Sequence, residues 1–174
     1  MMDIFSLAQC AGYCTFVFGI LACWQKNDRY FKIIITFTRV SYAVHFFLLD
    51  NPSACVISLI IGLRSLLAAY TRSLLVMTLM LVLSIVAGWF LSREAFNWIP
   101  VIATCIATVA FFRMNAIPMR ITLLSCSLLW LVNNIMSGSV GGTLLEVTLA
   151  VVNIITILRM LREAKKIKLE IQKT

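Results

Sequence analysis

Seven apolar runs, separated by short polar breaks, constrain this chain more than any other feature of its sequence. A helix needs about 20 apolar residues to cross the hydrocarbon core of a bilayer, and the runs approach that length. Hydrophobic residues make up 61% of the chain and charged residues 13%, whereas a soluble domain is roughly half apolar and a quarter charged. The sequence therefore predicts an all-α membrane protein with seven transmembrane helices, over residues 4–24, 31–50, 53–70, 73–92, 97–113, 119–137 and 141–161.

The runs are expected to form one membrane domain over residues 1–162, with a basic cytoplasmic tail over 163–174. No low-complexity linker divides the chain. The start, Met1-Met2-Asp3, has no basic residue and no small-residue cleavage motif follows the first run, so this run is expected to stay as a helix rather than act as a signal peptide. The tail is expected to be solvated and to contact anionic headgroups, with a partner-binding helix as the alternative.

Lysine and arginine are distributed unequally between the two sets of alternate breaks. The set that includes the N-terminus holds one cation, Arg93, followed by Glu94. The other set, with the tail, holds twelve: Lys26, Arg29, Lys32, Arg72, Arg113, Arg120, Arg159, Arg162, Lys165, Lys166, Lys168 and Lys173. Because Lys and Arg concentrate in cytoplasmic loops, the sequence predicts an external N-terminus and a cytoplasmic C-terminus. Because the cations behind the net charge of +8 lie mainly in these predicted cytoplasmic breaks and the tail, that charge does not indicate a nucleic-acid-binding protein. Nucleic acid is therefore not a predicted partner.

Cysteine and histidine usage gives no sign of a metal site or of catalysis. The six cysteines lie inside apolar runs without CxxC or Cys/His metal spacing, so they are expected to be small buried apolar side chains. The chain has no GxSxG, HExxH or glycine-rich phosphate loop. We therefore predict no cofactor and no enzymatic activity. An intramembrane enzyme that uses Glu146 and His45 is the least favoured alternative.

A weak internal repeat appears when the chain is displaced by 88 residues. Few residues are identical, but the order of features recurs. The aligned pairs are Asn27 with Asn115, Lys32 with Arg120, Tyr42 with Trp130, Val44 with Val132, and His45 with Asn133. Because one span, over about 73–92, separates the two units, both units point the same way. This predicts a 3+1+3 parallel repeat with units over about 4–70 and 96–161, an organisation common in transporters.

Several polar and aromatic residues inside the spans are spaced three, four or seven apart, which places them on common helix faces. If the two units pack about a pseudo-twofold axis, these faces converge on one polar pocket. The alternative is that the amides and hydroxyls hydrogen-bond neighbouring helices as packing contacts. The predicted substrate-binding residues are Tyr42, His45, Ser58, Trp130, Asn133, Glu146 and Asn153.

Glu146 is the strongest candidate among them. A carboxylate within a span must be protonated, paired or hydrated, and such residues commonly belong to functional sites. Arg39, in the middle of its span, is the predicted charge partner. Because Glu146 closely follows Gly141-Gly142, a position at the outer interface is the alternative. Arg64 is expected to extend its guanidinium toward the cytoplasmic headgroups.

Two motifs, VHFFLL at 44–49 and GSVGGTLLE at 138–146, resemble the YgjV family of bacterial inner-membrane proteins. The resemblance covers roughly residues 4–162. It implies a multi-pass protein of the bacterial inner membrane. The resemblance therefore indicates where the protein is located rather than which reaction it carries out.

The stretch LLWLVNN…GSVGGTLLE is more distantly similar to the SWEET and SemiSWEET sugar transporters and other PQ-loop proteins, which have the same 3+1+3 order. In SemiSWEETs an asparagine of the third helix faces the sugar pocket, and the resemblance places Glu146 at that position. The Pro-Gln pair of those proteins is absent: Trp24-Gln25 and Phe112-Arg113 stand in its places. Pro100 is the one proline at a hinge-like position.

Taken together, the spans, the repeat and the intramembrane polar residues predict a SWEET-like small-solute transporter or facilitator with a polar pocket between the two units. The alternative is a non-transporting membrane binding or scaffold protein of the same fold. The predicted partners are a small solute and the lipid bilayer, and the sequence is compatible with a homo-oligomer.

Overall fold

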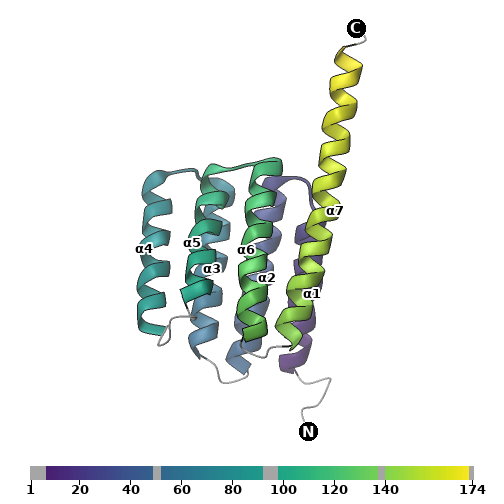
Figure 1. The fold of residues 1–174 in the computed structure, drawn as a ribbon. Helices are drawn as coiled ribbons and strands as arrows, with labels where there is room; N and C mark the ends of the chain where they lie inside the picture. Colours follow the sequence, from purple (N-terminus) through teal and green to yellow (C-terminus); the bar gives the residue numbers. More distant parts are fainter. Residues whose placement is uncertain (1–6, 49–51, 92–97, 137–139, 173–174) are drawn as a thin grey trace.

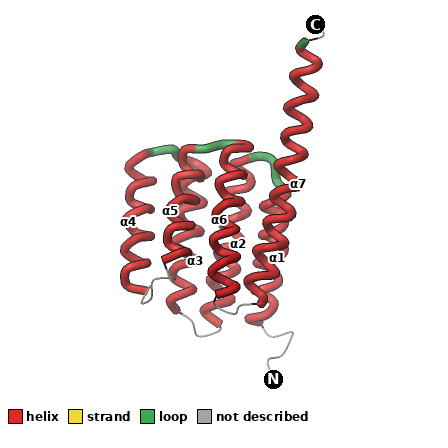
Figure 2. The backbone as a smooth tube through the Cα atoms, in the orientation of Figure 1, coloured by secondary structure: helices red, strands yellow, loops and turns green. Residues whose placement is uncertain are grey.

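The computed structural model describes residues 7–48, 52–91, 98–136 and 140–172, and these form seven α-helices. They are α1 (Leu7–Trp24), α2 (Asp28–Leu48), α3 (Pro52–Tyr70), α4 (Leu74–Leu91), α5 (Trp98–Arg113), α6 (Ala116–Met136) and α7 (Val140–Ile171). The helices lie side by side and alternate in direction (Figure 1), and the three described connections, at 25–27, 71–73 and 114–115, are short loops (Figure 2). The prediction of an all-α protein with seven helices is confirmed. Four of them, α1, α2, α6 and α7, are long and apolar enough to cross a membrane, while the described apolar stretches of α3, α4 and α5 are shorter, at Cys55–Tyr70, Leu74–Phe90 and Trp98–Arg113.

Large apolar side chains cover the outside of this bundle. Leu75 and Trp89 are each 72% exposed and Phe90 is 77% exposed, as expected for surfaces that face lipid rather than water. Inside the bundle, buried hydroxyl groups satisfy themselves locally, since each donates to the carbonyl oxygen four residues earlier in its own helix. These residues are Thr15, Thr38, Ser65, Ser84 and Thr108.

The helices form two layers with α4 at one edge. Helices α1, α2 and α3 lie in one layer, and α5, α6 and α7 lie in the other (Figure 1). The layers meet where α1 packs against α7 and where α3 packs against α5. Helix α4 packs mainly against α5. Gly88 permits this approach, because a Cβ atom there would lie 2.6 Å from a methyl carbon of Val101.

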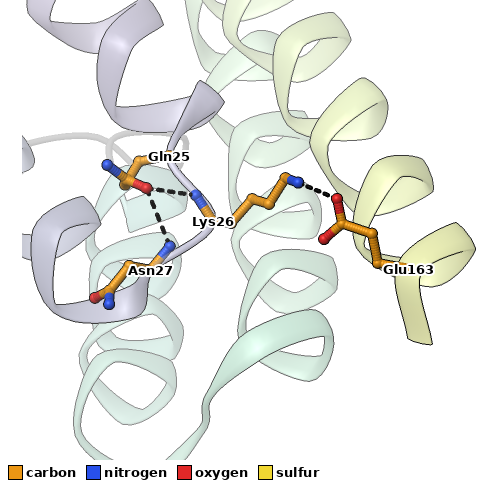
Figure 3. A network of polar contacts seen from close by, with 4 residues as sticks. All are labelled: Gln25, Lys26, Asn27 and Glu163. Carbon is orange, nitrogen blue, oxygen red and sulfur yellow. Dashed lines mark hydrogen bonds and ion pairs between the residues drawn. The ribbon is translucent and has the colours of Figure 1, made fainter. Parts of the chain in front are cut away.

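Helix α2 begins at Asp28, three residues before its predicted start, because Asn27 caps it. The Asn27 side-chain oxygen accepts hydrogen bonds from two N–H groups of the first turn, at 2.9 and 3.3 Å, as an N-cap residue does. Gln25 orders the preceding loop, since its side-chain oxygen accepts from the N–H groups of Lys26 and Asn27 (Figure 3).

Helix α6 likewise begins before its predicted start, at Ala116. The Ala116 N–H group donates to an Asp28 carboxylate oxygen at 2.6 Å. This bond holds Ala116 at a φ of 49°, in the left-handed region that residues other than glycine rarely adopt. Arg72 donates to the Asn115 side-chain oxygen at 2.7 Å. The two bonds therefore tie three connecting loops together at one end of the bundle.

Helix α7 continues to Ile171 instead of ending near residue 161. No Gly or Pro interrupts this stretch, and its Leu, Glu, Lys and Arg residues favour helix. The last turns are exposed and extend beyond the bundle (Figure 1). Glu163 forms an ion pair with Lys26 of the α1–α2 loop (Figure 3), and this hydrogen bond lowers the pKa of the Glu163 carboxyl below its ordinary value. The basic tail is thus a helical continuation of α7, with no break at residue 162.

Candidate functional site

A cavity of about 360 Å³ lies between α1, α2, α3, α6 and α7, where the two layers meet. Its volume is at the small end of the range for ligand pockets, about 300–1,000 Å³. We call it the central cavity. Five predicted residues line it together: Arg39, Tyr42, Ser58, Trp130 and Glu146.

A second space of about 110 Å³, which we call the annex, adjoins the central cavity. The annex reaches Arg64 on α3, Ser127 on α6 and Asn153 on α7. The two spaces share five lining residues: Arg39, Ile61, Trp130, Glu146 and Leu149. Residues from both layers therefore surround two adjoining spaces whose mostly apolar lining contains a few polar and charged side chains.

Glu146 lies at the junction of the two spaces, on α7. It is half-buried, and the Ser127 hydroxyl donates a hydrogen bond to its carboxylate. The Arg39 guanidinium attracts it electrostatically, but these two described side chains form no direct ion pair. The geometry thus brings the predicted charge partners to the same cavity while leaving room between them.

Arg39, on α2, has no hydrogen bond to any residue that the structure describes, and its Nε atom is buried without a partner. Its Cβ atom packs closely on α3, where a Cβ at Gly62 would lie 3.2 Å from it. Because Gly62 has no side chain, α2 and α3 can approach each other closely at the level of Arg39. A guanidinium without a protein partner in a membrane span needs water or an anion.

Asn153 lines the annex two helical turns beyond Glu146. It is only 6% exposed. Its amide nitrogen donates to the backbone carbonyl of Arg120 at 3.1 Å, while its side-chain oxygen is buried and has no partner. The nitrogen of this amide therefore links α7 to α6, and its oxygen remains a hydrogen-bond acceptor without a partner.

His45 and Asn133 are placed differently from the other candidates. The Nδ1 atom of His45 lies 2.6 Å from the carbonyl oxygen of Ala8, and the ring packs against Gly12 and stacks at 6.0 Å from the Tyr42 ring. His45 therefore links α2 to α1. Asn133 is half-buried on α6 and lines neither the central cavity nor the annex.

Comparison with known proteins places the chain in a family. Residues 6–164 match the family Imp-YgjV, described as bacterial inner membrane protein. The chain is 31% identical over 165 residues to "Inner membrane protein YgjV" of Escherichia coli (strain K12), a match that covers 95% of this chain and 90% of that protein. The chain belongs to the YgjV family. No solved structure matches it significantly. The predicted family and inner-membrane location are confirmed.

In this YgjV-family protein, two of the twelve cations counted on the basic side are buried in helices. Lys32 of α2 is 4% exposed and Arg120 of α6 is 0% exposed. The Lys32 ammonium donates to the backbone carbonyls of Phe111 at 2.5 Å and Ala68 at 3.2 Å. The Arg120 guanidinium donates to the carbonyls of Cys23, at 3.4 Å, and Gln25. Both residues lie inside their predicted spans, and their burial, which the sequence did not predict, is supported by carbonyl acceptors rather than by carboxylates.

These two contacts are related to one another and connect the layers. Lys32 and Arg120 are 88 residues apart, and so are their acceptors Cys23 and Phe111. Each cation reaches from the middle helix of one layer to the last turn of a helix in the other layer, where free carbonyls and the helix dipole favour a positive charge. The Arg120 guanidinium also lies 3.8 Å from the centre of the Phe31 ring. We call Lys32, Arg120 and these carbonyls the cation clamp.

Arg64 of this YgjV-family protein also differs from its prediction. It is 5% exposed and does not reach the headgroups. Its Nη1 atom donates to the Thr104 carbonyl at 3.1 Å and the Thr108 hydroxyl at 3.2 Å, and its guanidinium lies 5.0 Å from the centre of the Phe111 ring. Two hydrogen-bond acceptors on α5 thus satisfy part of the donor capacity of the Arg64 guanidinium, which borders the annex.

The cysteines follow their prediction only in part. Cys126 is buried and three others are half-buried, but Cys10 and Cys14 are exposed on α1. In the described parts of the chain, no group of three His, Cys, Asp or Glu residues is arranged to hold a metal ion.

Proposed function

We propose that this YgjV-family protein is a small-solute transporter or facilitator that binds its solute in the central cavity and annex. The observation that supports this most is the presence of Arg39 and Glu146 on one cavity in an otherwise apolar bundle. Charged side chains are costly inside a membrane and commonly mark solute pathways. Tyr42, Ser58 and Trp130 add aromatic walls and a hydroxyl group to the same site.

We further propose that the fold is a 3+1+3 parallel repeat of the SWEET-like type. The packing of α1 on α7 is the counterpart of the packing of α5 on α3 under a twofold axis along the bundle. The cation clamp follows the same relation, since Lys32 with Phe111 corresponds to Arg120 with Cys23. The solute would then bind at the interface of the two units, as in other repeat-built transporters.

We propose that the N-terminus is external and that the C-terminal helix is cytoplasmic. Burial of Lys32 and Arg120 removes two cations from those counted on the basic side, but the remaining cations still concentrate at the end where α7 extends. Single cysteines in a cysteine-free background, at 92–97 and at Lys165, should label from opposite sides of sealed vesicles. Residues 92–97 lie outside the described part of the chain. Labelling of both positions from the same side would contradict the orientation.

Transport itself is tested by filling the cavity. Leu145→Trp places a bulky side chain on the cavity lining, whereas the adjacent Leu144 is 62% exposed toward lipid. Proteoliposomes with the native protein should take up at least one of a panel of small solutes faster than empty liposomes. Leu145→Trp should reduce that uptake at least tenfold, and Leu144→Trp should leave it unchanged.

The alternative is a membrane binding or scaffold protein of the same fold. Solute binding that Leu145→Trp abolishes, without any uptake by proteoliposomes, would favour this alternative. We propose that the protein is not an enzyme and does not bind nucleic acid, and that its partners are the solute and the bilayer. Homo-oligomerisation is compatible with the apolar outer surface of the bundle.

A further inference from the structure

The charges around the central cavity and annex restrict the chemistry of the solute. Among the described lining residues, the cations are Arg39 and Arg64 and the one carboxylate is Glu146. The other titratable lining groups are Tyr42, Cys23 and Cys126, whose side-chain types are ordinarily neutral at pH 7. The lining therefore carries one more positive than negative charge. In a membrane span that excess favours an anion of one charge.

The two arginines differ in how many of their hydrogen-bond donors already have a partner in the protein. Arg64 already donates to the Thr104 carbonyl and the Thr108 hydroxyl. The Nε atoms of both arginines are buried and unpaired, but Arg39, unlike Arg64, has no hydrogen bond to any described residue. A guanidinium presents a planar fork of donors that fits a carboxylate through two parallel hydrogen bonds. Arg39 is therefore the group suited to bind a carboxylate.

Helix α7 presents hydrogen-bond acceptors to the same site, whereas Arg39 presents donors. The side-chain oxygen of Asn153 is buried and unpaired in the annex, and the Glu146 carboxylate borders both spaces. Both groups can accept hydrogen bonds, and Ser127 supplies only one donor to Glu146. A solute that fits this wall carries hydroxyl donors next to its carboxylate.

We propose that the solute is a small organic monoanion, a hydroxy carboxylate, whose carboxylate binds Arg39 and whose hydroxyl groups donate to Glu146 and Asn153. This proposal rests on the proposed function, because it takes the central cavity and annex as the solute site. A neutral sugar of the same size would leave the Arg39 guanidinium without an anion.

The test is a binding titration that compares each anion with its neutral amide. Trp130 lines both spaces, so its fluorescence reports on occupancy once Trp24, Trp89 and Trp98 are replaced by phenylalanine. Thermal shifts of the native protein provide an independent readout. The probes are lactate and gluconate, with lactamide, gluconamide and propionate as comparisons, all at constant ionic strength. At least one hydroxy carboxylate should bind ten times more tightly than its amide, and lactate should bind more tightly than propionate.

Variants of Arg39 assign the effect to this side chain. Arg39→Gln should weaken binding of the preferred anion at least tenfold, and Arg39→Lys should restore part of it, since charge is kept but the fork is lost. The matched control is Arg29→Gln, because Arg29 is exposed and packs on the Tyr70 ring at the end of the bundle. This control should bind as the native protein does.

The outcomes separate the two proposals. If an amide binds as tightly as its anion, or if Arg39→Gln binds normally, the anion proposal is wrong, while binding that Leu145→Trp removes would still support the cavity as the site. If propionate matches lactate, the hydroxyl contacts are wrong. If no probe binds to the native protein, both proposals lose their support.

Discussion

Arg120→Met should lower the free energy of unfolding by about 3 kcal/mol, because it removes charge-assisted hydrogen bonds worth about 1.5–3 kcal/mol each. Arg120 is fully buried and donates to the Cys23 and Gln25 carbonyls. Methionine fills much of the same volume but cannot donate, so the Gln25 carbonyl would lose this donor, while the Cys23 carbonyl would keep only the Thr156 hydroxyl, which donates to it at 2.7 Å. The Asn153 amide bonds to the backbone of residue 120 and should persist. Chemical and thermal unfolding of the purified protein in detergent would measure the loss.

The matched control for this prediction is Arg29→Met. Arg29 lies 4.8 Å from the centre of the Tyr70 ring but is exposed, and an exposed cation–π contact contributes only about 0.5–1 kcal/mol. Lys32→Met, at the related position, should destabilise as Arg120→Met does. If Arg120→Met unfolds at the same midpoint as Arg29→Met, the cation clamp does not hold the layers together.

The number and the approximate positions of the helices could be predicted from the sequence because apolar length is a strong signal in membrane proteins. The helix ends could not. Asn27 caps α2 and so starts it earlier than predicted. The Asp28 carboxylate accepts a hydrogen bond from the first N–H group of α6, which is distant in the sequence. The extension of α7 follows from the absence of any breaking residue after 161. Apolar periodicity does not report such capping contacts.

The candidate site was predictable where a polar side chain faces a cavity, and less so where it meets another helix. Arg39, Ser58 and Glu146 line the central cavity, whereas His45 bonds to the α1 backbone. Helix-face spacing identifies which residues share a face, but not which neighbouring helix covers that face. The 88-residue register did contain the signal for the cation clamp, since it aligned Lys32 with Arg120, but burial of both could not be read from it.

Glu146→Gln should abolish the pH dependence of anion binding while leaving the protein folded. The groups that act on Glu146 are Arg39 and Tyr42 on α2, Cys23 on α1 and Ser127 on α6. When Glu146 is protonated, the lining carries the full positive charge of Arg39 and Arg64, and the carbonyl oxygen of the neutral carboxyl can still accept a hydrogen bond from a solute hydroxyl. When pH rises through the pKa of Glu146, the new negative charge repels a carboxylate. Native binding should therefore weaken with rising pH, by about tenfold for a charge effect of ~1.4 kcal/mol.

Glutamine keeps the shape of Glu146 but has no charge to gain, so the variant should bind the preferred anion equally well at low and high pH, with the affinity that the native protein shows at low pH. The control is Glu163→Gln, which removes the same charge from the exposed end of α7, where it pairs with Lys26. That variant should keep the native pH dependence. The measurement is the same Trp130 titration at pH 5 and pH 8, with a thermal melt of each variant. If Glu146→Gln fails to fold, the carboxylate is structural; if its binding still falls with pH, another group in the lining titrates and Glu146 does not set the charge of the site.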